Sequence, residues 1–388
     1  MYQVVLVHDG EAAWADEVEA ELRAACRRVA HSDAGLVRAA TVADAAATSD
    51  PTVVVCLATP TTAGSAAMAH ELTAAKGFAL PVLPVVRAGT SVTASLPTGI
   101  RRLNALTWDD HDAVSLSVLR ALGLAETERR LFLSYRQIET SALAMQLRHA
   151  LADRSFDVFL DRFSVPPGAD FQRRINEELS DKAFVLLLES AGAVGSDWVQ
   201  HEVTYALSHN IALLAFTTPD TETEQQFEVV DEAFRLRLAL GDLVGPTGST
   251  QVLSAGSLAR ILDEVEARHA RGVRRRRLQL LASASDFLHD AGYDRWPLDE
   301  WSVLGSKNGD NVVLAATPVA PAPNALRRLD LNRRRAEDDG LGPGSVRIAC
   351  LVHEAPDVND AERALVDWII EGRPLSTSIV TEIPGLLR

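Results

Sequence analysis

Two side chains with a chemical use, an indole and a carboxylate, stand four residues apart in the segment 195–202, Gly-Ser-Asp-Trp-Val-Gln-His-Glu. In a helix this spacing places Trp198 and Glu202 on one face, one turn apart. The Gly-Ser-Asp before Trp198 supplies a break and capping oxygens for the start of such a helix. A fixed carboxylate beside an aromatic wall can stabilise positive charge that grows on a substrate. The alternative is an amphipathic surface helix in which Trp198 anchors the core and Glu202 is solvated.

The elements around this segment predict a parallel sheet. Residues 183–188, Ala-Phe-Val-Leu-Leu-Leu, form an apolar run of strand length without polar alternation, which is typical of a strand buried on both faces. The predicted helix therefore begins just past the carboxyl end of a strand, where open α/β sheets bind ligands. Residues 130–136 and 158–161 are two earlier predicted strands. The second leads through the rigid turn Val-Pro-Pro-Gly at 165–168 into a predicted helix over 170–179.

These segments, in this order, resemble the TIR (Toll/interleukin-1 receptor) domain family. The Phe-Leu-Ser-Tyr-Arg strand at 132–136 resembles the first box of that family, and Asp161 with Pro-Pro-Gly resembles its BB loop. The Asp-Trp-Val-Gln-His-Glu segment at 197–202 resembles the segment that carries the catalytic glutamate of the NAD-cleaving members. The sequence resembles the TIR domain of the animal axon-degeneration NAD hydrolase and its bacterial relatives over about residues 129–268.

The resemblance implies an NAD glycohydrolase in which NAD is the substrate and no cofactor is needed. It implies that Glu202 is catalytic and that the products are nicotinamide and ADP-ribose or a cyclic isomer, in bacterial antiviral or stress defence. The substrate-binding residues that it implies are Trp198, Tyr135, Arg136, Asp161 and Ser164. Other roles stay open, because Arg136 could form a surface ion pair and Asp161 could cap a turn. Relatives complete their sites by self-association of TIR domains, so we expect an oligomer.

Two other functions are compatible with the same segments. A non-catalytic adaptor would use TIR surfaces only to assemble with partners, although signalling adaptors usually lack the Trp-x-x-x-Glu pair. A nucleotide-sensing regulator built from flavodoxin-like modules is the second alternative, but no Gly-rich phosphate loop of the usual spacing is present.

The segment 59–73 aligns with the segment 190–204 without a gap. Glu71 aligns with Glu202 and Gly64 with Gly195 at one constant offset (202 − 71 = 131 and 195 − 64 = 131). The first part of the chain therefore resembles a second, degenerate TIR copy. Ala67 replaces the Trp and the Pro-Pro-Gly loop has no counterpart, so we expect Glu71 to be inactive. The alternative is two flavodoxin-like domains with a chance match.

Composition and charge restrict the class of protein. The chain has 388 residues, 47% hydrophobic and 5% aromatic, which is typical of two or three globular domains. We predict a cytoplasmic protein, because there is no signal peptide, no run long enough to span a membrane and no Cys-x-x-Cys pair among three cysteines. A net charge of −15 makes nucleic acid an unexpected partner. The basic run at 271–277 follows acidic residues and is expected to pair with them or with a neighbouring domain.

The sequence thus predicts an α/β fold with tandem flavodoxin-like, parallel-sheet TIR-type domains and a small α+β C-terminal module. The predicted domains are residues 1–125 (degenerate copy), 129–270 (catalytic TIR domain) and 278–388 (unknown role, a candidate sensor of an unknown trigger). Within them, the sequence favours helices over 227–240, 257–271 and 278–291, a hairpin at 307–310 and a last strand over 378–383. The aromatic residues of the last module are expected to be core anchors.

Overall fold

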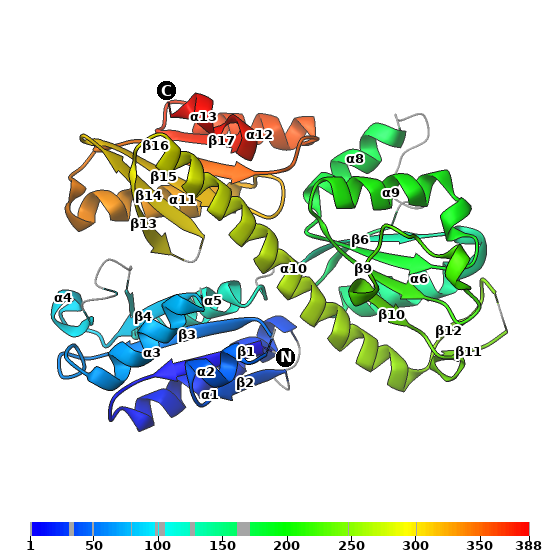
Figure 1. Ribbon diagram of the computed structural model, residues 1–388, viewed down its shortest axis with the longest axis horizontal. Coiled ribbons are helices and arrows are strands. Elements are labelled where there is room, and N and C mark those ends of the chain that lie inside the picture. Colours follow the sequence, from blue (N-terminus) through cyan, green and yellow to red (C-terminus); the bar gives the residue numbers. More distant parts are fainter. Residues whose placement is uncertain are drawn as a thin grey trace.

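The computed structural model describes residues 2–30, 35–48, 50–78, 80–97, 100, 105–124, 129–160, 171–246, 248–299 and 301–387. Three five-stranded sheets lie one in each third of the chain, and the long helix α10 (Ala255–Asp290) runs between the parts that they form (Figure 1). We call the parts built on these sheets the first, central and third units. None of the helices in these ranges has the length and apolar composition needed to cross a membrane.

The first unit is a parallel sheet between two helix layers. Its strand order is β2-β1-β3-β4-β5, and every pairing is parallel. Apolar side chains of α1 and α5 cover one face of the sheet, and those of α2 and α3, with Leu96 just after α4, cover the other. The strands are Tyr2–Val7, Leu36–Ala39, Thr52–Ala58, Val82–Val86 and Leu106–Thr107 for β1 to β5, and the helices are Ala12–Ala30, Val42–Ala46, Ala66–Gly77, Val92–Ser95 and His111–Ala121 for α1 to α5.

The central unit repeats this plan. Its strand order is β10-β9-β8-β6-β7, all parallel, with α6 and α10 on one face and α8 and α9 on the other. The strands are Arg130–Tyr135, Asp157–Phe159, Phe184–Glu189, Ala212–Thr217 and Arg235–Arg237 for β6 to β10, and the helices are Gln137–Ala152, Phe171–Asp181 and Asp197–Ser208 for α6, α8 and α9. A two-stranded ribbon, β11 (Leu243–Val244) and β12 (Val252–Leu253), precedes α10.

Both parallel sheets have the strand order 2-1-3-4-5 of flavodoxin-like folds, which confirms the predicted fold class. The spacing of the sequence repeat recurs in the elements: α3 and α9 begin and end 131 residues apart (197 − 66 = 131 and 208 − 77 = 131). Strands β4 and β9 end at the same offset (217 − 86 = 131). The assignment of the first unit as a degenerate TIR copy stays a prediction.

The predicted helix over 227–240 is wrong. This segment instead holds the 3-10 turn Glu232–Phe234 and then β10, the fifth strand of the central sheet, and its last residue, Leu240, begins a second 3-10 turn. Arg235 at the start of β10 binds the buried Glu189 on β8. A contact between residues so far apart in the chain overrides the local helical periodicity of the segment.

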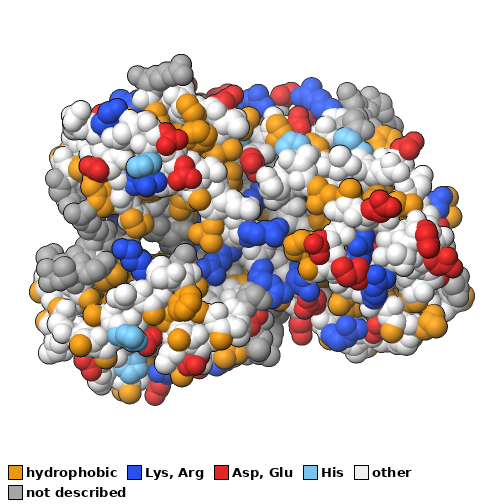
Figure 2. All heavy atoms as spheres, viewed as in Figure 1, with side chains coloured by type: hydrophobic (Ala, Val, Ile, Leu, Met, Phe, Trp, Pro, Cys, Tyr) orange, Lys and Arg blue, Asp and Glu red, His pale blue; other side chains and the backbone are white. Residues whose placement is uncertain are grey.

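Helix α10 replaces two predicted helices with one of 36 residues, about 54 Å long at the usual rise per residue. The basic run lies in its middle, where arginine is a good helix former. Gly272 lets the helix approach β9, because a Cβ there would lie 2.3 Å from the Cβ of Ala212. Side chains of α10 enter one hydrophobic core of each unit. Lys and Arg side chains gather over its middle on the face shown in Figure 2.

The third unit is a mixed sheet of order β13-β14-β15-β16-β17, antiparallel up to β15 and parallel beyond it. The predicted hairpin is present, with Asn308 and Gly309 both at positive φ between β14 and β15. The last strand is Leu375–Ile379 rather than 378–383, and Trp368 on α12 is exposed rather than a core anchor. The other strands are Asp294–Asp299, Ser302–Lys307, Asp310–Ala316 and Val346–His353, and the helices are Pro323–Ala336, Asp360–Ile370 and Ile383–Leu386 for α11 to α13.

Candidate active site

Helix α9 places the predicted acid at the carboxyl edge of the central sheet. It begins at Asp197, directly after a 3-10 turn that follows β8. Ser196 occupies the N-cap position, but its side chain makes no capping hydrogen bond, so its predicted capping role is not fulfilled by the hydroxyl. The inner face of α9 packs Val199 and Val203 against the sheet. Glu202 lies on the same buried side of the helix.

Glu202 points into the protein and not into solvent. The residue is 3% exposed, and the hydroxyl of Ser134 donates a hydrogen bond to its Oε2 at 2.5 Å. Ser134 is the penultimate residue of β6, which pairs with β8. The carboxylate therefore lies over the carboxyl ends of the two strands at which the strand order reverses, the usual ligand position of this topology.

Trp198 lies one turn earlier on α9 and is 47% exposed. The alternative, in which the indole anchors the core and the acid is solvated, is therefore wrong: the acid is buried and the indole is half exposed. A buried acid and a half-exposed aromatic side chain are the arrangement expected when a ring forms the outer wall of a site.

The other predicted site residues have definite partners. Tyr135, the last residue of β6, is buried in the core on the α6 face. Arg136 forms an ion pair with Glu139, with Nη1 2.6 Å from Oε1, and a Cβ on Gly192 would collide with its guanidinium. Glu139 also accepts hydrogen bonds from the hydroxyl of Ser190 and the N–H of Gly192. The alternative that Arg136 forms an ion pair thus describes its state in the isolated chain.

Asp161 and Ser164, with the Pro-Pro-Gly turn, lie outside the described residues. Their predicted roles at the rim of the site stay predictions.

His201 and Tyr205 face helix α8 and the third unit. His201 Nε2 lies 2.8 Å from Oδ1 of Asn176, and burial lowers the pKa of the imidazole. Tyr205 shares hydrogen bonds with Ser180 of α8 and with Asp357 of the third unit, and burial raises the pKa of its phenol. The third unit therefore contacts the helix that carries Glu202, one turn beyond the acid.

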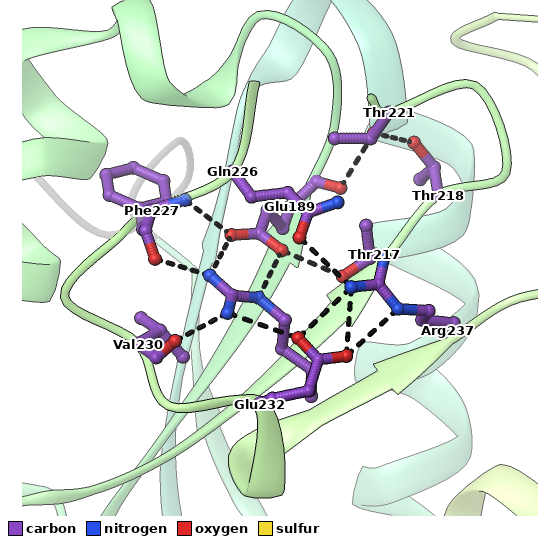
Figure 3. A network of polar contacts seen from close by, with 10 residues as sticks. Glu189, Thr217, Thr218, Thr221, Gln226, Phe227, Val230, Glu232 and Arg237 are labelled. Atoms are coloured by element: carbon purple, nitrogen blue, oxygen red, sulfur yellow. Dashed lines mark hydrogen bonds and ion pairs between the residues drawn. The ribbon is translucent and has the colours of Figure 1, made fainter. Parts of the chain in front are cut away.

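The sequence did not reveal Glu189, which ends β8 and is fully buried (Figure 3). Its carboxylate accepts hydrogen bonds from Thr217 Oγ1 (2.7 Å), from the N–H of Phe227 (2.8 Å) and from Nε and Nη2 of Arg235 (3.1 and 3.2 Å). This network joins the carboxyl ends of β8 and β9 to the start of β10. The next residue, Ser190, binds Glu139, so the network also fixes the loop that holds Arg136. In the sequence, the one sign of its role is that this acidic residue directly follows the apolar run at 183–188.

The described residues contain no group of three or more His, Cys, Asp or Glu side chains placed to hold a metal ion. The charged groups at the carboxyl edge include the Glu202–Ser134 pair and the Arg136–Glu139 pair, besides the buried Glu189 and its partners.

The sheet order and the acid at the carboxyl edge define a flavodoxin-like α/β module. The model of the TIR domain family matches residues 131–236, which begin in β6 and end in β10. This segment belongs to the TIR domain family.

Comparisons with other proteins add little to this assignment. No curated protein sequence matches the chain. Among solved structures, the chain is similar to proximal thread matrix protein 1 from the mussel byssus (12% identity, 70% of this chain and 96% of that one, TM-score 0.22). It is also similar to a protein of Silicibacter pomeroyi described as a phosphosugar isomerase (14% identity, 70% and 84% coverage, TM-score 0.20).

Proposed function

We propose that the TIR domain cleaves the bond between nicotinamide and ribose in NAD. The observation that carries this proposal is Glu202, a buried carboxylate held by Ser134 over the carboxyl edge of the sheet, one turn from the half-exposed Trp198. The TIR family contains both NAD-cleaving enzymes and adaptors, and this pair of side chains favours the enzymes.

The reaction suits a site with a single carboxylate. When the glycosidic bond breaks, both of its electrons go to the ring nitrogen, so the cationic pyridinium leaves as neutral nicotinamide and needs no proton from an acid. The remaining requirement is to stabilise positive charge on the ribose carbon, which a fixed carboxylate does electrostatically. Water then bonds to that carbon and releases a proton, giving ADP-ribose. If a ring nitrogen of the adenine bonds there instead, the product is a cyclic isomer.

The neighbouring side chains would bind the rest of NAD. Trp198 would stack on the departing ring or the sugar. Arg136 is the cation at this edge for the diphosphate, and it would have to exchange Glu139 for phosphate oxygens. Tyr135, Asp161 and Ser164 enter this proposal by their resemblance to the family alone.

The enclosure of Glu202 supports control by assembly. Because Glu202 is only 3% exposed, NAD would reach the acid only after the groups that cover it rearrange. We propose that self-association of TIR domains drives this opening, that the first unit is a docking surface for it, and that the third unit responds to a trigger. Contacts of the third unit with α8 and α9, through Ser180, Tyr205 and Asp357, are one route from such a trigger to the acid.

The test is nicotinamide release from NAD by the full chain at high concentration or with a crowding agent. We expect Glu202→Gln to lower the rate by about a hundredfold or more, because the amide keeps the size of the side chain and an oxygen for Ser134 but loses the charge. Glu71→Gln is the matched control, since Glu71 holds the aligned position in the first unit and binds the N–H of Val42. Full activity of Glu202→Gln would exclude this acid as the catalytic group.

A non-catalytic adaptor is the second candidate, and one observation favours it. Glu202 and Glu139 both bind groups of the protein, while the large side chain of Trp198 is left half exposed, as in a surface used for self-association. An adaptor would change its oligomeric size on Trp198→Ala and would release no nicotinamide at any protein concentration.

A further inference from the structure

A groove lies between part of the first unit and one face of helix α10. Its volume is about 580 Å³, within the usual range of small-molecule sites. One wall comes from the first unit, at the segments before β3 and β4, and includes Asp50 and Phe78. The other wall is one face of α10 and includes Arg271, Arg274 and Leu278, which are spaced at helical intervals.

The charge of this groove is strongly positive, in contrast to the net charge of the chain. Three arginines line it, at positions 271, 274 and 275, and its one acidic lining residue is Asp50. Asp50 already pairs with Arg271 at 3.6 Å. Arg274 has neither a hydrogen bond nor an ion pair with any residue that the structure describes. Burial and the neighbouring Arg277 lower the pKa of Arg274 to about 10, which is the result expected for a cation without a counter-charge.

Apolar surface lies beside these cations. Phe78, at the end of α3, is 54% exposed although it lines the groove, and Leu278 faces it from α10. An exposed phenylalanine across the groove from guanidinium groups can hold a flat ring by stacking while the cations bind the anionic substituents of that ring.

The groove is separate from the Glu202 site. Its residues precede β3 and β4, so they lie at the amino-terminal edge of the first sheet, whereas Glu202 lies at the carboxyl edge of the central sheet. Figure 2 shows Lys and Arg side chains gathered near the junction of the units. A ligand here would contact both the first unit and the helix that continues into the central and third units.

We propose that this groove binds a nucleoside phosphate. The phosphates would lie against Arg274 and Arg275, because guanidinium groups bind phosphate oxygens with two parallel hydrogen bonds. The base would stack on Phe78. Inorganic polyphosphate shares the anionic part of this chemistry but not the ring, so the two kinds of ligand differ in their dependence on Phe78.

The experiment is calorimetric titration of the full chain with ATP, with pyrophosphate and with adenosine. We expect Arg274→Gln to lower the affinity for ATP and for pyrophosphate by about tenfold or more. Phe78→Ala should lower the affinity for ATP by about tenfold and change the affinity for pyrophosphate little. Neither substitution, at Arg274 or at Phe78, removes a hydrogen bond or an ion pair, so we expect both variants to fold. Their melting temperatures check this. Arg260→Gln is the matched control, because Arg260 lies on the same helix outside the groove and pairs with Asp242. It should leave both affinities unchanged.

Three results would overturn the proposal. The first is the absence of binding of both phosphate ligands at millimolar concentration. The second is unchanged affinity in Arg274→Gln. The third is ATP binding that Trp198→Ala abolishes and Arg274→Gln leaves intact, because it would place the nucleotide in the TIR site. The titration needs no turnover, so its outcome is independent of whether the chain cleaves NAD.

Discussion

Removal of Arg235 is expected to destabilise the central unit strongly. In Arg235→Met the fully buried Glu189 keeps two donors, Thr217 Oγ1 and the N–H of Phe227, but loses its counter-charge and two charge-assisted hydrogen bonds. The carbonyl oxygens of Phe227 and Val230 lose the same guanidinium. Breaking a buried ion pair by removing one partner costs about 3–5 kcal/mol.

This magnitude separates the buried pair from an exposed neighbour in the same network. Arg237 lies two residues further on β10, is 52% exposed at its side chain and pairs with the exposed Glu232. Arg237→Met should therefore cost less than about 1 kcal/mol. The double variant Glu189→Gln with Arg235→Met removes both charges and should recover a large part of the loss, because apolar or neutral replacement of a whole buried pair is often close to neutral.

The assay is scanning calorimetry together with hydrogen exchange of the β8 and β9 amides, which reports on the central unit alone. At about 2–4 °C per kcal/mol for a domain of this size, the single Arg235→Met change should lower the melting temperature by roughly 6–20 °C. Two results would refute the view that an unpaired buried Glu189 causes the destabilisation. One is a melting temperature of Arg235→Met no lower than that of Arg237→Met, and the other is a melting temperature of the double variant below that of Arg235→Met.

Three further predictions concern the site and its surroundings. Ser134→Ala removes the donor to Glu202 and should cost about 1.5–3 kcal/mol of unfolding free energy and slow nicotinamide release, whereas Ser134→Thr should restore both. Burial, with Arg276 and Arg363 nearby, lowers the pKa of His353 to about 4. As the pH falls, the imidazole is therefore protonated in the unfolded chain before it is protonated in the folded one, and the free energy of unfolding should fall by about 3 kcal/mol from pH 6.5 to pH 4. In denaturation at both pH values, His353→Asn should lose this dependence and the exposed His289→Asn should keep it. Deletion of residues 1–128 should change either basal NAD turnover or oligomeric size, and no change in either would remove the docking role of the first unit.

Local sequence patterns predicted the parts of the fold that depend on apolar periodicity. The unbroken apolar run of β8 is a strand covered on both faces, and α9 begins after its turn as expected. The segment 227–240 was misread because its apolar residues have helical spacing, while its structure depends on Arg235 finding a carboxylate 46 residues earlier. The continuity of α10 was missed because a run of arginines reads as a boundary, although three separate cores bury parts of this helix.

The repeat shows why spacing alone could not settle the site. Glu71 and Glu202 hold the same position on equivalent helices, so sequence predicts the same direction for both side chains. Their partners differ. Glu71 accepts a hydrogen bond from the N–H of Val42 and so stabilises the start of α2, whereas Glu202 accepts one from the hydroxyl of Ser134 on strand β6 of the central unit. In the first unit the carboxylate is therefore committed to a helix terminus, and Ala67 leaves no aromatic wall beside it. An acid at this position is available to a substrate only if no other group of the protein requires its carboxylate. The group that binds the carboxylate comes from the facing strand or loop, and not from the helix that carries the acid.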